Sequence, residues 1–215
     1  MNKVKVCGMT DLADAEHAAS HGAWAIGLIH HPESPRYVRP EVAEEIGAAL
    51  KRRCEIAGVF VNSPLEDVIE AAERENLTIL QFHGEEGPSF CIEARRRTGA
   101  KVIKAMRVTS AADVQAAEAF RTDFHLFDAY WHGIHGGTGT RFDWDLVAKR
   151  RSKVPMILAG GLSAENVADA VELVKPFAVD VVSGVEAQPG RKDHAKVEAF
   201  LEAAGVQLSS GAASP

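Results

Sequence analysis

Long apolar runs, paired cysteines and an excess of positive charge are all missing from this chain of 215 residues. No apolar run approaches the roughly 18 residues that a membrane span needs, and the first residues lead into strand-like sequence rather than a signal peptide. The cysteines, Cys7, Cys54 and Cys91, are far apart and include no CxxC pair, which indicates neither a disulfide framework nor a zinc site. We therefore expect a cytoplasmic protein.

The balance of charge also limits the partners. The chain has 24 Lys and Arg residues against 30 Asp and Glu, a formal net charge of −6, so it offers no basic field for nucleic acid or for an anionic membrane. Its 46% hydrophobic and 25% charged residues are typical of a soluble globular protein. A small-molecule partner is favoured, with no nucleic acid and no membrane.

Short β-branched runs alternate with stretches of helical period along the whole chain. The predicted strands cover 3–7, 24–29, 55–61, 78–82, 101–105, 123–128, 154–159 and 179–183, and the predicted helices cover 11–21, 41–50, 64–75, 87–97, 110–120, 143–150, 164–174 and 192–204. Eight such units predict a single α/β domain, a (β/α)₈ TIM barrel over residues 1–205, with a disordered tail at 206–215. Two small domains would also fit the length, but no GxGxxG follows the first strand to support an open doubly wound sheet.

Local signals mark some helix ends. In "SPLE" we expect Ser63 as the N-cap, Pro64 at the first helical position and Glu66 closing a capping box. The basic runs at 51–53, 95–97 and 149–153 each fall at a predicted helix C-terminus, where cations complement the helix dipole. These runs are interpreted as solvated helix ends.

Chemically capable residues follow several predicted strands. Cys7 ends the first strand, Arg36 lies in the second βα loop, His83 follows the fourth strand and Asp128 ends the sixth. Because active sites of this fold lie where strands end, these four side chains are expected to converge at one mouth.

Glycine-rich turns follow the late strands. They are "GGTG" at 136–139, "AGGLS" at 159–163 and "VSGVE" at 182–186. Glycine allows close backbone approach to an anion, and the loops after strands seven and eight are the usual phosphate site of this fold, so a phosphorylated small molecule is predicted as the ligand. The His132 and His135 pair has metal-like spacing but no obvious third ligand, so no metal site is predicted.

Eight segments together resemble the phosphoribosylanthranilate isomerase family of tryptophan biosynthesis, from about residue 3 to 200. These are "KVCGMT", "GLIHHPESPRYV", "GVFVN", "LQFHGEE", "VIKA", "GGTGTRFDW", "ILAGGLSAENV" and "VSGVEAQPGRKD". The resemblance implies an Amadori rearrangement of N-(5-phosphoribosyl)anthranilate to 1-(2-carboxyphenylamino)-1-deoxyribulose 5-phosphate. It implies neither metal nor organic cofactor, because the anthranilate nitrogen itself supplies the imine, and it leaves open a monomer or a homodimer.

The resemblance also implies roles for individual residues. Asp128 would be the general acid and Cys7, as thiolate, the general base. Arg36 would hold the anthranilate carboxylate, and His83 would be a substrate-binding residue that orients its neighbours. The backbone around Gly160, Gly161, Ser183 and Gly184 would hold the phosphate, and the loop with Gly137 would close over the sugar. Two features depart from the family pattern: His30-His31 at the exit of the second strand, and Val182 where a hydroxyl residue is common.

Two other functions stay open at the level of sequence. Lys104 lies in the fifth strand, where a barrel of this kind can place the imine-forming lysine of a Schiff-base aldolase. A non-catalytic barrel that binds phosphorylated ligands is the other alternative, although the presence of both Cys7 and Asp128 argues against it.

Overall fold

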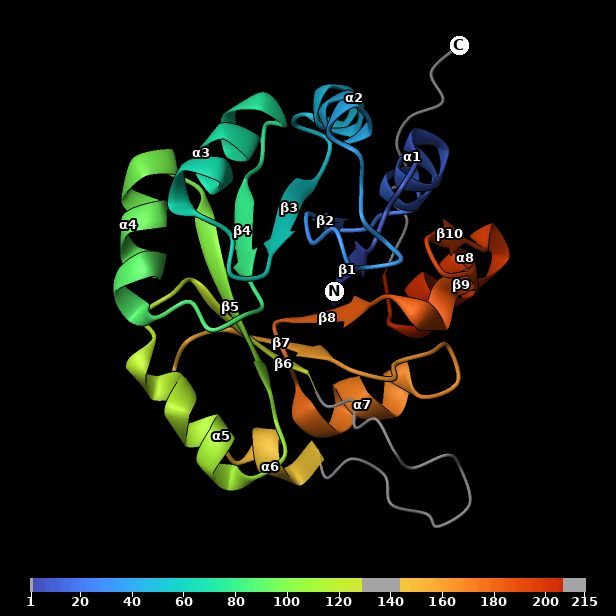
Figure 1. Cartoon of the computed structure of the whole chain (residues 1–215). Coiled ribbons are helices and arrows are strands. Elements are labelled where there is room, and N and C mark those ends of the chain that lie inside the picture. The colour runs from blue at the N-terminus through green and yellow to red at the C-terminus, as the bar shows by residue number, and fades with distance from the viewer. Residues whose placement is uncertain (1, 129–143, 207–215) are drawn as a thin grey trace.

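Eight parallel strands close into a barrel with helices packed around the outside, as seen in the computed structural model of the chain (Figure 1). The structure describes residues 2–128 and 144–206. The strands are β1 (Lys3–Cys7), β2 (Ala25–Ile29), β3 (Glu55–Phe60), β4 (Ile79–Phe82), β5 (Lys101–Arg107), β6 (Phe124–Asp128), β7 (Met156–Ala159) and β8 (Ala178–Val181). The main helices are α1 (Leu12–Ser20), α2 (Pro40–Leu50), α3 (Leu65–Arg74), α4 (Pro88–Thr98), α5 (Ala111–Ala116), α6 (Trp144–Ala148), α7 (Val167–Val174) and α8 (His194–Ala203). The predicted fold class is confirmed.

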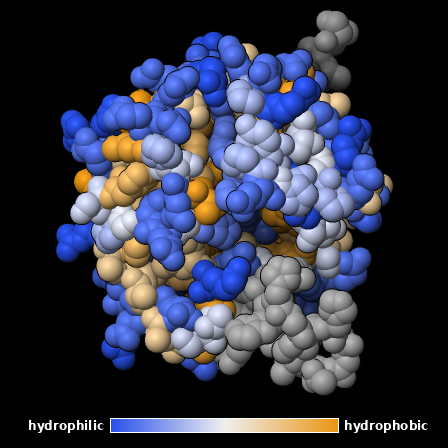
Figure 2. Space-filling model, in the orientation of Figure 1, coloured by the Kyte–Doolittle hydropathy of each residue, from blue (hydrophilic) through white to orange (hydrophobic). Residues whose placement is uncertain are grey.

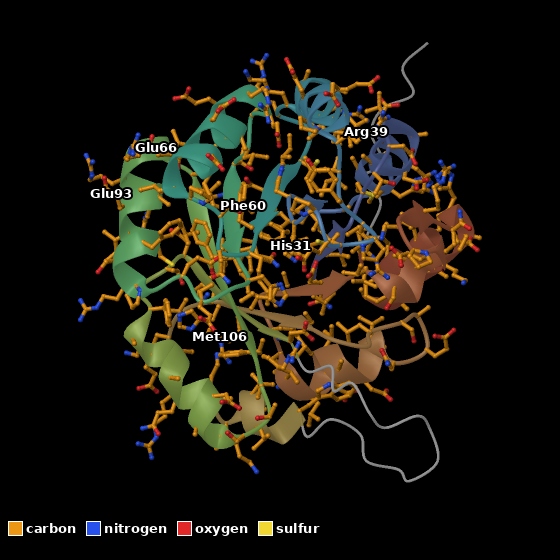
Figure 3. All side chains as sticks on the ribbon, viewed as in Figure 1. His31, Arg39, Phe60, Glu66, Glu93 and Met106 are labelled. Carbon is orange, nitrogen blue, oxygen red and sulfur yellow. The ribbon has the colours of Figure 1, made fainter. Side chains whose placement is uncertain are left out.

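Closure places the first strand beside the last. β1 pairs in parallel with β8, with Val4 opposite Val179, as well as with β2. Consecutive strands pair in chain order around the barrel, so all eight carboxyl ends open on the same side. In Figure 3 the labelled His31, Phe60 and Met106, at or just after the ends of three different strands, lie around this opening.

The period of two along each strand divides the core in two layers. In β6, Phe124 and Leu126 belong to the cluster inside the barrel, while Phe127 belongs to the layer between strands and helices. The last inward position of β6 is Asp128, at the mouth. In β6 the alternation therefore places apolar side chains inside the barrel and a polar one at its mouth.

Helix ends follow the sequence signals in part. The run Arg95–Arg97 lies in the last turn of α4, and the other basic runs follow α2 and α6, as predicted. The capping prediction at Ser63 is wrong: Pro64 has extended backbone and is itself the N-cap of α3, without a side-chain hydrogen bond. Glu66 instead accepts from Arg97 of α4 at 2.8 Å, on the outer surface of the helix layer (Figure 3).

Two small elements follow β8 that the sequence patterns did not predict. A 3₁₀ turn, η2 (Ser183–Val185), leads to an antiparallel hairpin of β9 (Glu186–Gln188) and β10 (Arg191–Lys192). The predicted strand 179–183 thus ends at Val181, and the predicted last helix begins two residues later, at His194.

The surface is mostly hydrophilic on the face shown in Figure 2. Within the described ranges, the large hydrophobic side chains that are exposed are Ile92 and Leu173. No helix within residues 2–128 and 144–206 is both long and apolar enough to cross a membrane.

Candidate active site

A pocket of about 400 Å³ opens at the carboxyl ends of the strands. Seven of the residues predicted from sequence line it: Cys7, Arg36, His83, Asp128, Gly160, Gly161 and Ser183. They come from six different βα units, which the parallel topology brings to one end of the barrel. A pocket of this size suits a small molecule.

Cys7 is the last residue of β1, and its thiol is almost fully buried at the pocket wall. Its partner in register on β2 is Gly27, where an added Cβ would lie 2.4 Å from the thiol sulfur. Gly27 is therefore the residue that leaves room for the thiol. Burial raises the pKa of Cys7, and the positive charge of Lys5 lowers it by less.

Lys5 and Asp180 form a buried ion pair on the inward face of the barrel, one inward position below Cys7. Lys5 Nζ donates to Asp180 Oδ1 at 2.9 Å, and the two side chains are 0% and 6% exposed. Burial opposes the charge of Lys5, yet Asp180 and Cys7 together raise its pKa above the ordinary value. A permanent positive charge thus lies next to the thiol, where it favours the thiolate. No local sequence pattern predicts this pair, because its members lie 175 residues apart in the chain.

His83 and Asp128 face each other across the pocket. His83 Nε2 lies 3.8 Å from Asp128 Oδ2, beyond hydrogen-bond distance. Burial lowers the pKa of His83 by more than the carboxylates of Asp128 and Asp180 raise it, so the ring is neutral at pH 7. A neutral imidazole offers one donor and one acceptor to a bound molecule.

Gln81 is a pocket residue that the sequence analysis missed. It is 2% exposed, and its Nε2 lies 3.5 Å from His83 Nδ1. Its Oε1 is buried without a hydrogen-bond partner among the described residues. Since buried polar atoms are nearly always paired, this oxygen marks a place for a donor from a ligand. The available signal was its position two residues before His83, on the same face of the strand.

Arg36 is held in place by a carboxylate from the other end of the chain. Its Nε and Nη2 donate to the two oxygens of Glu186 at 2.8 and 2.6 Å. This bidentate contact uses one edge of the guanidinium and leaves Nη1, so the side chain can still donate into the pocket that it lines. Gly8, with φ of +78°, allows this approach, because an added Cβ would lie 3.0 Å from Arg36 Cδ.

Glu186 also joins the hairpin to this site. Its Oε1 accepts from Lys192 Nζ at 3.1 Å and from the Gly190 amide at 3.2 Å. Burial alone would raise the pKa of Glu186, but Arg36 and Lys192 lower it below the ordinary value. The carboxylate therefore stays ionised and fixes the direction of Arg36.

The loops after β7 and β8 meet at the pocket, which residues 159–162 and 181–183 line. Gly160 and Gly161 have φ of +98° and +63°, a backbone region that favours glycine. Gly184 follows the pocket residue Ser183, and an added Cβ there would lie 2.0 Å from the carbonyl oxygen of Leu162. The amides of Gly161 and Ser183 take part in none of the backbone hydrogen bonds of the described residues. The two loops thus form a glycine-lined cradle suited to an anion.

The other residues singled out from the sequence differ in where they lie. Gly137 and the His132 and His135 pair fall outside the described residues. Lys104 is buried away from the pocket, where its Nζ donates to the Gly84 carbonyl at 2.6 Å and to Glu86 at 3.0 Å. The ring of His30 stacks on that of Phe60, with centroids 4.8 Å apart. At the end of β2 it is Ile29, and not His30, that lines the pocket. Val182 lines the pocket.

The fold and the pocket define a (β/α)₈-barrel enzyme with its site at the carboxyl ends of the strands. A sequence profile of the N-(5'-phosphoribosyl)anthranilate (PRA) isomerase family matches residues 4–203. The N-(5'-phosphoribosyl)anthranilate isomerase of Geobacter metallireducens is 46% identical over 204 residues, which cover 95% of this chain and 99% of the relative. The N-(5'-phosphoribosyl)anthranilate isomerase of Ralstonia pickettii is 42% identical over 214 residues, and the match covers 94% of this chain and 91% of the relative.

Solved structures agree with the sequence comparison. Phosphoribosyl anthranilate isomerase from Thermotoga maritima superposes with a TM-score of 0.88 at 40% identity, over 95% of this chain and 99% of that one. A phosphoribosyl anthranilate isomerase in complex with reduced 1-(o-carboxyphenylamino)-1-deoxyribulose 5-phosphate superposes with a TM-score of 0.84 at 38% identity, over 95% and 99%. The chain belongs to the phosphoribosylanthranilate isomerase family, and its function is the isomerase step of tryptophan biosynthesis.

Proposed function

We propose that Cys7 and Asp128 carry the Amadori rearrangement of N-(5-phosphoribosyl)anthranilate in the pocket at the barrel mouth. The observation that carries this assignment is that both side chains line one pocket, together with a guanidinium and a glycine-lined cradle. The substrate has a carboxylate at one end and a phosphate at the other. The pocket offers a guanidinium for one of these anions and glycine-lined loops with amides that make no backbone hydrogen bond for the other.

The reaction is divided between an acid and a base. Asp128 donates a proton to the ring oxygen of the ribose, and the lone pair of the anthranilate nitrogen forms the C1′=N bond as the C1′–O bond breaks. The Cys7 thiolate then removes the proton from C2′. The electrons of that C–H bond form the C1′=C2′ bond of an enolamine while the π electrons of the C1′=N bond return to nitrogen. Tautomerisation, with a proton added at C1′ and the C2′ hydroxyl proton lost, gives the ketose product. General acid–base groups of this kind contribute about 10²–10⁴-fold each.

The thiol needs help to act as a base. Burial raises the pKa of Cys7, so the free protein at neutral pH holds it mainly as the thiol. Lys5 acts against that effect because its positive charge lowers the pKa of Cys7, whereas the negative charge of Asp180 raises it and so offsets part of the contribution of Lys5. We assign Lys5 the role of stabilising the thiolate.

Binding falls to the other pocket residues. Arg36, oriented by Glu186, holds the anthranilate carboxylate, for which a planar guanidinium is well shaped. The amides around Gly160, Gly161, Ser183 and Gly184 hold the phosphate, and the loop with Gly137 closes over the sugar. His83 and Gln81 donate and accept hydrogen bonds with the ribose hydroxyls. A phosphorylated small molecule is thus the partner, in a cytoplasmic monomer or homodimer that needs no nucleic acid.

The decisive experiment replaces Cys7 with serine. Cys7→Ser keeps the size and polarity of the side chain but gives a hydroxyl that does not ionise near neutrality, so kcat should fall by at least about 10²-fold. Asp128→Asn should have an effect of the same order. Both variants should bind reduced 1-(o-carboxyphenylamino)-1-deoxyribulose 5-phosphate with near-normal affinity. A Cys7→Ser protein that turns over within a few-fold of wild type, with the same pH dependence, would mean that the base lies elsewhere.

A further inference from the structure

A cluster of imidazole and carboxylate groups lies on the outer layer, away from the pocket residues. His17 is in the last turn of α1, His21 caps the C-terminus of that helix, and Glu198 lies on α8. α1 and α8 are neighbours at the seam where the first unit of the barrel meets the last (Figure 1). The ligand atoms that these three residues offer all lie within 4.8 Å of one another. We propose that His17, His21 and Glu198 form a binding site for Zn²⁺.

Two of the three ligand separations are close to those around a tetrahedral ion. Glu198 Oε1 lies 3.1 Å from His17 Nε2 and 3.6 Å from His21 Nε2. Two ligands on tetrahedral Zn²⁺, with Zn–N and Zn–O bonds near 2.0–2.2 Å, are about 3.4 Å apart. The His17 contact is not a hydrogen bond, because Nε2 of His17 has no partner of acceptable geometry among the described residues. A metal ion between the three atoms would satisfy all of them.

The orientation of the rings also suits a metal. His21 Nδ1 lies 2.8 Å from the carbonyl oxygen of His17, which can only accept, so Nδ1 carries a proton and Nε2, on the side of Glu198, is the nitrogen left for a metal ion. Metal-binding histidines commonly donate their other N–H to a backbone carbonyl in this way. The ring of His194 stacks on that of His17 with centroids 3.8 Å apart, and its Nε2 donates to the buried Asp14 at 2.9 Å. His194 therefore holds the first ligand ring in place.

The ligand set is one that zinc prefers. Two imidazoles and one carboxylate leave a fourth position for water. The side chains are 18%, 32% and 51% exposed, so the ion can enter from solvent. Such an ion would join helices at opposite ends of the chain, and cross-links that close long loops stabilise most. The three thiols compete poorly, because burial raises the pKa of Cys7 and raises those of Cys54 and Cys91 to about 11.

Calorimetric titration of the tag-free full-length protein with Zn²⁺ at pH 7.5 tests this site. We expect one ion per chain, and a rise in Tm of roughly 5–10 °C when free Zn²⁺ is about 100 times Kd. His21→Ala and Glu198→Gln should each weaken binding at least about 10-fold and lose that rise. Glu202→Gln, an exposed carboxylate on the same helix outside the cluster, should bind as wild type.

Two results would overturn the proposal. One is the absence of Zn²⁺ binding by the wild-type protein up to millimolar concentration. The other is undiminished binding by both His21→Ala and Glu198→Gln, which would place the ion elsewhere on the chain, for example at His132 and His135. Because Glu198 is half exposed, its glutamine variant should fold normally, which keeps the comparison interpretable if His21→Ala is unstable.

Discussion

Gly27→Ala should move the thiol of Cys7, the proposed base, without replacing any of the side chains that we propose for the chemistry. The new Cβ would lie 2.4 Å from the sulfur of Cys7 and 2.9 Å from its Cα, against a normal contact of about 3.5–4.0 Å. Rotation of the Cys7 side chain cannot relieve the clash between the new Cβ of residue 27 and the Cα of Cys7. The sulfur and the backbone of Cys7 must therefore shift by roughly 1 Å. A displacement of that size can reduce kcat about 10²-fold. Overpacking should also cost about 1–3 kcal/mol of stability, a fall in Tm of roughly 2–10 °C.

Steady-state kinetics, measured for all variants at one temperature about 20 °C below the lowest Tm among them, give the effect on kcat. Thermal unfolding gives the effect on stability. Gly87→Ala is the matched control, because an added Cβ there meets nothing within 4 Å and its φ of −79° suits any residue. We expect the control to keep near-normal kcat and Tm. A Gly27→Ala protein with the expected fall in Tm but a kcat within about 3-fold of wild type would show that the position of the thiol does not limit the rate.

Three more outcomes test other parts of the site. Lys5→Met removes the charge that lowers the pKa of Cys7, so the acidic limb of the kcat/KM–pH profile should move to higher pH. The double variant Lys5→Met, Asp180→Asn should shift that limb less, because it also removes the carboxylate that raises the pKa of Cys7. Gly184→Ala forces the loops after β7 and β8 apart and should raise KM roughly 10-fold or more, the value of one hydrogen bond to a charged group, while an unchanged KM would exclude this turn from phosphate binding. Borohydride treatment of wild-type protein with a sugar phosphate should leave its mass unchanged, because Lys104 is paired with Glu86; a reduced adduct on Lys104 would revive the aldolase hypothesis.

The fold could be predicted because its determinants are local. Alternating β-branched runs and helical periods are visible one unit at a time, and eight parallel units leave little choice but a closed barrel. The convergence of Cys7, Arg36, His83 and Asp128 then follows from topology alone, since each ends or follows a strand.

The contacts within the site could not be predicted in this way. The partners of Lys5 and of Arg36 are 175 and 150 residues away, and no local pattern marks a pair of that separation. In the sequence Gln81 is one polar residue among others in a strand. Only the structure shows that its Oε1 is buried and has no hydrogen-bond partner among the described residues. The Ser63 cap was wrong for a related reason. Glu66 finds a partner in Arg97 on the next helix, and this contact competes with the local one.

The contact of Arg36 with Glu186 also bears on the order in which the enzyme is made. At roughly 5–20 residues per second, synthesis of the 150 residues between them takes roughly 8–30 s. During that time the ribosome-bound chain has Cys7 and Arg36 but lacks the carboxylate that orients the guanidinium. Residues 186–192 therefore complete a site whose first member was translated at position 7. A nascent chain stalled before Glu186 would contain all eight strands and still lack the carboxylate that orients Arg36, the residue proposed to hold the anthranilate carboxylate.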